Sequence, residues 1–230
     1  MGLYLYMWQR CIEDRGFAII PEALTHAEVE QLLGQFAQLR RSRAGIRHAL
    51  RHPPIAAFAR DARLIGIAQE ILGPKAFPFR ATLFDKSRNA NWLVVWHQDT
   101  ALPLRGRKES PGWGPWSVKE NVIYAHAPAA ALRQVLALRV HLDDSTAQNG
   151  PLRVLPGTHT LGVLSNDEIH QLATDIPAVV CLVAAGGILA MRPLVVHSSS
   201  KSQAQYPRRV LHIEFAPSPV VAEGLELAIA

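Results

Sequence analysis

Downstream of Pro78 the sequence consists of short apolar runs that alternate with turn-forming residues. The runs are rich in β-branched and aromatic residues, a pattern typical of β-strands. So many short strands within about 140 residues favour a sandwich or barrel over a series of strand–helix–strand units. The predicted strands cover residues 80–85, 92–98, 137–142, 152–155, 179–183, 187–191, 195–197 and 209–215.

The first third of the chain has a helical pattern instead. Thr25 and Glu28 have the spacing of a capping box, which predicts the start of a helix. Asp61 can cap a second helix, which ends at Gly73 and Pro74. Helices followed by many strands predict an α+β fold that is mostly β.

The chain has 230 residues, a net charge of +5, and only two cysteines, which form no zinc-binding motif. Its apolar runs are too short to span a membrane, and no signal peptide is evident, so we expect a cytoplasmic protein. A basic cluster is either a solvated helix end or a site for an anionic substrate group. No nucleic-acid-binding motif accompanies it, so nucleic acid is not an expected partner. The cluster comprises Arg40, Arg41, Arg43, Arg47, His48, Arg51 and His52.

The sharpest local motif is His97-Gln98-Asp99. Residues two apart in a strand point the same way, so His97 and Asp99 can bind one metal side by side. The motif is short enough to arise by chance, and a third ligand must come from elsewhere. His197, at the end of an apolar run, is the candidate. Two histidines and one carboxylate form the facial triad that suits non-haem Fe(II) and leaves positions open.

Arg208 and Arg209 follow His197 and begin a strand. A guanidinium can donate two parallel hydrogen bonds to the far carboxylate of a chelated cosubstrate. Arg208 shares a strand face with His212 and Glu214, and this polar face could line a wet cavity.

Four stretches in this order resemble the phytanoyl-CoA dioxygenase family of Fe(II)- and 2-oxoglutarate-dependent oxygenases. Residues 16–24 resemble the opening strand of the family, and residues 96–99 resemble its metal motif. Residues 142–159 resemble its central segment, which includes Asn-Gly-Pro and Pro-Gly-Thr-His. His197 and Arg208 resemble its distal histidine and cosubstrate arginine.

The resemblance implies a double-stranded β-helix, the cupin-like jelly roll, with N-terminal helices at its flank. It implies a single domain over residues 1–230, with a mainly helical flank at 1–78 and the jelly-roll core at 79–216. The implied iron ligands are His97, Asp99 and His197.

The resemblance also implies that Arg208 binds 2-oxoglutarate and that Ser199 is a second contact. Arg209 is an alternative to Arg208, because one residue of misalignment exchanges them. Thr82 and Lys86 are further candidates for contacts with cosubstrate or substrate. His159 belongs to a structural turn in the family pattern rather than to the metal site.

Residues 105–128 form an aromatic segment with little periodicity. Long loops of this kind serve as lids or binding loops, so Trp113 and Trp116 are candidate substrate contacts. The alternative is a loop packed on its own tryptophans.

The implied function is hydroxylation of a C–H bond in a small or medium organic substrate. The reaction consumes dioxygen and 2-oxoglutarate and releases succinate and CO2. The alternatives are a non-catalytic metal-binding jelly roll that senses or binds a ligand, and an oxygenase that demethylates nucleic acid.

Overall fold

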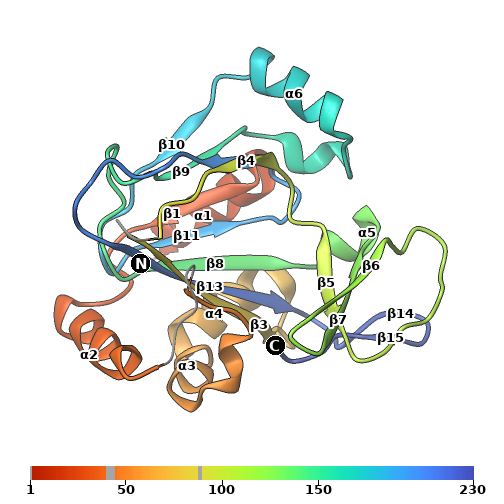
Figure 1. The fold of residues 1–230 in the computed structure, drawn as a ribbon, viewed down its shortest axis with the longest axis horizontal. Coiled ribbons are helices and arrows are strands. Elements are labelled where there is room, and N and C mark those ends of the chain that lie inside the picture. The colour runs from red at the N-terminus through yellow and green to blue at the C-terminus, as the bar shows by residue number, and fades with distance from the viewer. Residues whose placement is uncertain (1, 40–44, 88–89) are drawn as a thin grey trace.

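A computed structural model describes residues 2–39, 45–87 and 90–230. Its core consists of two β-sheets that face each other (Figure 1). The major sheet has six antiparallel strands in the order β1-β11-β8-β13-β3-β2. These strands are β1 (Phe17–Ile20), β2 (Gly45–Ile46), β3 (Phe77–Lys86), β8 (Leu136–His141), β11 (Ile188–Met191) and β13 (Arg208–Ala216).

The minor sheet has four antiparallel strands in the order β10-β9-β12-β4. Together the sheets form the predicted double-stranded β-helix, with strands close to the eight predicted segments. Because β1 joins the major sheet, the predicted boundary at residue 78 does not separate flank from core. The minor-sheet strands are β4 (Val94–His97), β9 (Leu152–Val154), β10 (Val179–Cys181) and β12 (His197–Ser199).

Helices cover the outer face of the major sheet (Figure 1). The capping box of Thr25 and Glu28 is present, and Asp61 caps the fourth helix, as predicted. The helix over residues 2–15 was not predicted. No helix in the described ranges is long and apolar enough to cross a membrane. The N-terminal helices are α1 (Gly2–Arg15), α2 (His26–Ala37), α3 (Pro53–Phe58) and α4 (Ala62–Leu72).

Alternation along the major sheet separates the helix-facing core from an inner polar face. Leu83 of β3 and Leu211 of β13 are fully buried in the apolar cluster that includes the helices. Their neighbours Thr82 and His212 point to the opposite side, toward the minor sheet, because side chains alternate along a strand.

The expected loop at 105–128 is wrong in its second half, where two strands form a hairpin that joins a strand before residue 105 in a small sheet. These strands are β5 (Ala101–Leu104), β6 (Trp116–Lys119) and β7 (Val122–His126). The turn between β6 and β7 has positive φ at Glu120 and Asn121. Hairpin turns of this shape usually carry Asn-Gly or Asp-Gly, so Glu120-Asn121 could not be recognised as a hairpin turn from its residue types.

The remaining elements are short and lie outside the two main sheets. They are η1 (Ala49–Arg51), α5 (Ala129–Leu132), η2 (Thr158–Leu161), α6 (Asn166–Asp175), β14 (Val220–Ala222) and β15 (Leu225–Glu226).

Candidate metal centre and cosubstrate site

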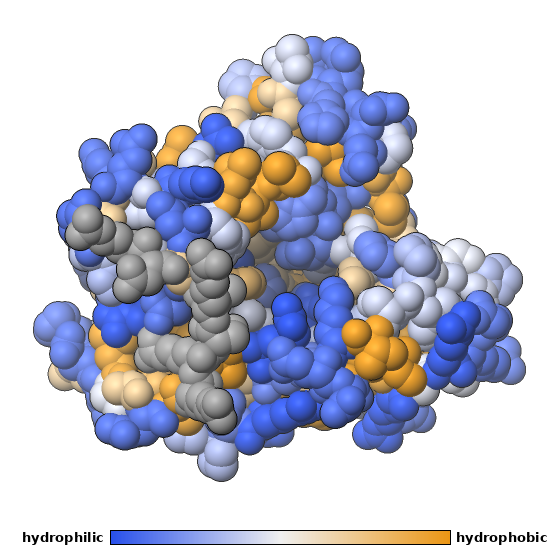
Figure 2. Space-filling model, viewed as in Figure 1, coloured by the Kyte–Doolittle hydropathy of each residue, from blue (hydrophilic) through white to orange (hydrophobic). Residues whose placement is uncertain are grey.

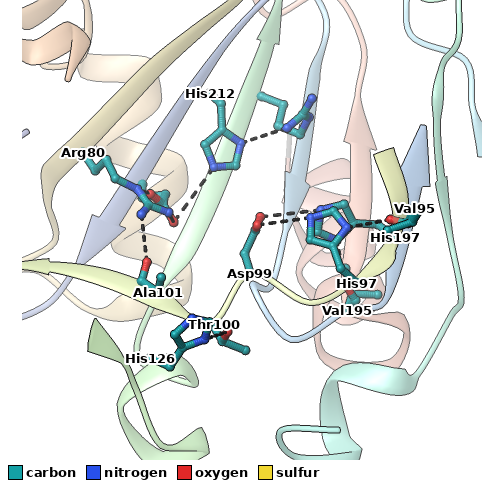
Figure 3. A network of polar contacts seen from close by, with 12 residues as sticks. Arg80, Val95, His97, Asp99, Thr100, Ala101, His126, Val195, His197 and His212 are labelled. Carbon is teal, nitrogen blue, oxygen red and sulfur yellow. Dashed lines mark hydrogen bonds and ion pairs between the residues drawn. The ribbon is translucent and has the colours of Figure 1, made fainter. Parts of the chain in front are cut away.

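The pairing of β4 with β12 brings the two predicted histidine ligands together. His97 ends β4, His197 begins β12, and the two are register partners with ring centroids 4.2 Å apart. Asp99 follows β4, and its backbone N–H donates to the Pro193 carbonyl at 3.0 Å. Its carboxylate points at both imidazoles, with Oδ1 3.5 Å from His97 Nε2 and Oδ2 3.6 Å from His197 Nε2 (Figure 3).

Both imidazoles are oriented in the same way by the backbone. Nδ1 of His97 lies 2.9 Å from the Val95 carbonyl, and Nδ1 of His197 lies 2.9 Å from the Val195 carbonyl. A carbonyl only accepts hydrogen bonds, so Nδ1 carries the proton in each neutral ring. The Nε2 lone pair of each ring is therefore free to bind a metal. A metal-ligating histidine usually donates its other ring N–H to a carbonyl or carboxylate in this way.

The electrostatics favour ligands that are ready to bind. Burial alone raises the pKa of Asp99, but the His197 and His97 imidazoles outweigh it and hold that pKa well below its usual value. Burial lowers the pKa of His197 to about 4, despite the neighbouring Asp99 carboxylate. One donor atom from each residue lies within 4.8 Å of the others. This set of two imidazoles and one carboxylate fits Fe(II) at a facial triad.

The triad faces a cavity of about 200 Å³ between the sheets. Figure 2 shows this side of the molecule hollowed near its centre, with hydrophilic residues along the lower rim. Thr82, Ser199 and Arg208, three of the predicted cosubstrate contacts, line the cavity. The complete lining is Arg80, Thr82, Phe84, Trp92, Val94, His97, Asp99, Arg139, Leu152, His197, Ser199, Arg208 and His212.

Arg208 is 4% exposed and has no carboxylate partner among the described residues. Its Nε donates to the Asn149 carbonyl at 3.2 Å, and its Nη2 lies 3.4 Å from Ser199 Oγ. Lys86 is buried behind them, where its Nζ donates to Ser199 Oγ at 2.8 Å and to the Ser200 carbonyl at 2.7 Å. Burial and the nearby Arg208 lower the pKa of Lys86 to about 8. A buried cation pair of this kind is costly unless an anion binds to it.

Arg209 is oriented away from this cavity. Its side chain makes two hydrogen bonds to Asp143, at 2.8 and 2.7 Å, and its backbone N–H donates to the same carboxylate at 2.7 Å. The geometry therefore favours Arg208 over Arg209 as the cosubstrate contact.

The Asn-Gly-Pro stretch of the central segment supports the arginine and the serine. Asn149 offers its carbonyl to Arg208, and Gly150 offers its carbonyl to Ser199 Oγ at 2.8 Å. A Cβ atom on Gly150 would lie 2.2 Å from the Ser200 carbonyl oxygen, and its φ is +68°. Only glycine permits this close approach of the two backbones.

A group of polar residues on the cavity floor includes two arginines that the sequence did not single out. Arg80 pairs with Glu214 and donates to the Ala101 carbonyl at 2.8 Å (Figure 3). Arg139 donates to His212 Nδ1 at 3.0 Å, while its Nε has no hydrogen-bond partner among the described residues. The polar face predicted for β13 indicated that polar side chains line the cavity. It could not show that Arg80 and Arg139 lie on the two strands that pair with β13.

Other predicted residues lie apart from the cavity. Trp113 is 8% exposed and packs in an apolar cluster with Leu102 and Leu104, and Trp116 packs against the same cluster. Neither tryptophan lines the cavity, so the structure does not support them as substrate contacts. His159 Nε2 lies 3.0 Å from the Glu13 carbonyl, in keeping with a structural turn.

The basic cluster is only partly described. Arg40, Arg41 and Arg43 lie outside the described residues. Arg47 forms an ion pair with Glu120 at 3.0 Å.

Known proteins resemble this chain in sequence and in fold. A profile of the family described as phytanoyl-CoA dioxygenase (PhyH) matches residues 12–210. L-proline trans-4-hydroxylase of Streptomyces griseoviridis is 24% identical over 178 residues, which cover 66% of this chain. The match spans 59% of the hydroxylase, less than two thirds of its length.

Solved structures share the fold. The epimerase SnoN from nogalamycin biosynthesis, in complex with Fe3+, alpha ketoglutarate and nogalamycin RO, matches with a TM-score of 0.73 and 18% identity. The alignment covers 95% of this chain and 86% of SnoN. HygX from Streptomyces hygroscopicus, with nickel and 2-oxoglutarate bound, matches with a TM-score of 0.66 and 14% identity. That alignment covers 92% of this chain and 86% of HygX.

Proposed function

Because the chain belongs to the phytanoyl-CoA dioxygenase family, we propose that it is an Fe(II)- and 2-oxoglutarate-dependent oxygenase. The observation that carries this proposal is one cavity that contains both a facial triad and the buried Arg208, which has no carboxylate partner among the described residues. The reaction we propose is hydroxylation of a C–H bond by dioxygen, with 2-oxoglutarate converted to succinate and CO2.

The side chains have separate tasks in this proposal. His97, Asp99 and His197 hold Fe(II), which supplies the oxygen activation that amino-acid side chains cannot provide. Arg208 binds the distal carboxylate of 2-oxoglutarate through its fork of N–H groups. Ser199 adds a hydroxyl contact, and Lys86 supports it with a second positive charge.

The substrate we propose is a small or medium organic molecule. The relative named L-proline trans-4-hydroxylase and the SnoN complex with nogalamycin RO support this class. We propose further that residues 1–230 act as a single oxygenase domain. The cytoplasmic location stays a prediction.

The test uses the protein loaded anaerobically with Fe(II) and then supplied with ascorbate, dioxygen and labelled 2-oxoglutarate. We expect slow succinate release even without substrate, and its loss in the His97→Ala variant. Binding of 2-oxoglutarate without any succinate release would favour the alternative of a non-catalytic sensor. Absence of both binding and turnover would refute the assignment.

A further inference from the structure

Given the oxygenase function above, we propose that the primary substrate is a small organic anion whose charged group binds in a second chamber beside the metal cavity. This chamber, which we call the anion chamber, has a volume of about 210 Å³. It shares Arg80, Thr82 and Phe84 with the metal cavity, so a molecule seated in it can extend toward the triad. Its lining is Gly45, Ile46, Arg47, Arg80, Thr82, Phe84, Lys119 and Tyr124.

The anion chamber extends along β3 from Phe84 to Arg80, away from the end of the strand where Lys86 lies beside Arg208. In the register of β3 with β13, Lys86 lies opposite Arg208 at one end, and Arg80 lies opposite Glu214 nearer the other. Arg80 and Lys86 are six positions apart along β3, which corresponds to about 20 Å of strand. A 2-oxoglutarate molecule bound at Arg208 therefore leaves the anion chamber open to a second ligand.

The charges in the anion chamber favour an anionic ligand. Three cationic side chains line it, and two of them have acidic partners: Arg80 pairs with Glu214, and Arg47 pairs with Glu120. Lys119 has no carboxylate partner within the described ranges. Lys119 is exposed overall, but partial desolvation together with the nearby Arg47 and Arg80 lowers its pKa, the direction expected for a lysine beside two other cations. A bound carboxylate or phosphate would relieve the repulsion between these cations.

A hydroxyl and two apolar side chains complete the recognition surface. Tyr124 is 3% exposed, and its hydroxyl lies 2.8 Å from His48 Nε2. The Lys119 ammonium lies 5.0 Å from the centroid of the tyrosine ring. Phe84 and Ile46 offer apolar contact for the carbon body of the ligand.

Lys119 ends β6 immediately before the tight turn of the β6–β7 hairpin. The next two residues, Glu120 and Asn121, have φ values of 49° and 64°. A left-handed conformation is unfavourable for glutamate, and such strain is found where structure positions a functional group. The turn is fixed by the Glu120 carboxylate, which lies 3.0 Å from Arg47 Nη1 and 3.5 Å from His48 Nδ1.

The test compares matched ligand pairs on protein loaded with Mn(II) and 2-oxoglutarate, where no turnover occurs. Each carboxylic acid is paired with its amide, and each phosphate monoester with its parent alcohol. Calorimetric titration should show binding of charged members at least tenfold tighter than that of their neutral partners. The two kinds of pair show whether carboxylate or phosphate is preferred. In the Fe(II) enzyme, the charged members that bind should also stimulate succinate release.

Variants connect the binding to the anion chamber. Lys119→Met should weaken the best charged ligand about tenfold and leave its neutral partner unaffected. Lys75→Met, at an exposed lysine outside the lining, is the matched control and should change neither. A separate titration of 2-oxoglutarate into each Mn(II)-loaded variant reports whether that variant is folded.

The outcomes separate this inference from the proposed function. If 2-oxoglutarate binds but neutral ligands bind as well as charged ones, the inference is overturned and the oxygenase assignment stands. Charge selectivity that persists in the Lys119→Met variant also overturns the inference. Failure of 2-oxoglutarate to bind the wild-type protein overturns both.

Discussion

The exchange of either neighbouring arginine for methionine tests the cosubstrate site most directly. Arg208 and Arg209 differ by one position, yet only Arg208 lines the metal cavity. Methionine keeps much of the apolar stem of each side chain and removes its charge. Arg208→Met should therefore weaken 2-oxoglutarate binding strongly, and Arg209→Met should leave it within about twofold.

The structure allows the magnitude to be worked out. Loss of one partner from a buried, hydrogen-bonded charge pair costs about 2–5 kcal/mol. Arg208 is 4% exposed, so water screens it little, but the neighbouring Lys86 retains part of the attraction. The lower half of that range, about 3 kcal/mol, corresponds to a loss of affinity of about 100-fold. Arg209→Met instead breaks a partly buried ion pair with Asp143 and should cost about 1 kcal/mol of folding stability.

Calorimetric titration of 2-oxoglutarate into the Mn(II)-loaded proteins measures both affinities without turnover. Thermal melting of the apo proteins provides the stability comparison. Arg208→Met should not be destabilised, because it removes a buried charge that has no carboxylate partner in the described ranges. Wild-type affinity in Arg208→Met, or an equal loss in Arg209→Met, would show that Arg208 is not the cosubstrate contact.

Three further predictions concern metal, pH and backbone. His97→Ala removes one of three ligands and should weaken Fe(II) binding at least about 100-fold, measured by competition with a chromophoric chelator. Lys86 must be charged to attract 2-oxoglutarate, so affinity should fall as the pH rises through about 8; Lys86→Arg should remove this dependence in a pH series of titrations. Gly16→Ala should cost about 2 kcal/mol of stability, because Gly16 has φ +84° and the new Cβ would lie 2.6 Å from His159 Nδ1. Gly34→Ala, in a helix with no neighbouring atom within 4 Å of the new Cβ, should instead raise the melting temperature.

The sequence was most informative about side-chain directions that follow from the alternation of residues along one strand. The two-residue spacing of His97 and Asp99 predicted that both side chains face one metal, and the Asp99 carboxylate does point at the His97 imidazole, although Asp99 lies just beyond the end of β4. Alternation along β13 also predicted the polar inner face that holds Arg208 and His212. Arg139 could not be placed in the same way. Alternation gives the face of a strand but not its neighbour in the sheet, and Arg139 meets His212 only because β8 pairs with β13.

The aromatic segment shows a different limit. Its tryptophans attracted a functional interpretation because large aromatic residues in a long loop are typical of lids. In the structure Trp113 is buried in an apolar cluster, while Lys119 and Tyr124 of the same segment line the anion chamber. The two strands that carry Lys119 and Tyr124 were missed because the hairpin turn at Glu120 lacks the glycine that usually marks such turns.

One ion pair connects the register of β13 to the chemistry of the site. A shift of one residue would turn every side chain of the strand to the other face, so Arg209 would enter the cavity and Arg208 would leave it. Asp143 opposes such a shift, because it binds both the backbone N–H and the guanidinium of Arg209. The Arg209–Asp143 pair thus adds to the backbone pairing of β13 with β3 and β8, which sets the register that directs Arg208 inward. Asp143 of the central segment therefore contacts the strand that carries Arg208, although Asp143 does not itself line the metal cavity.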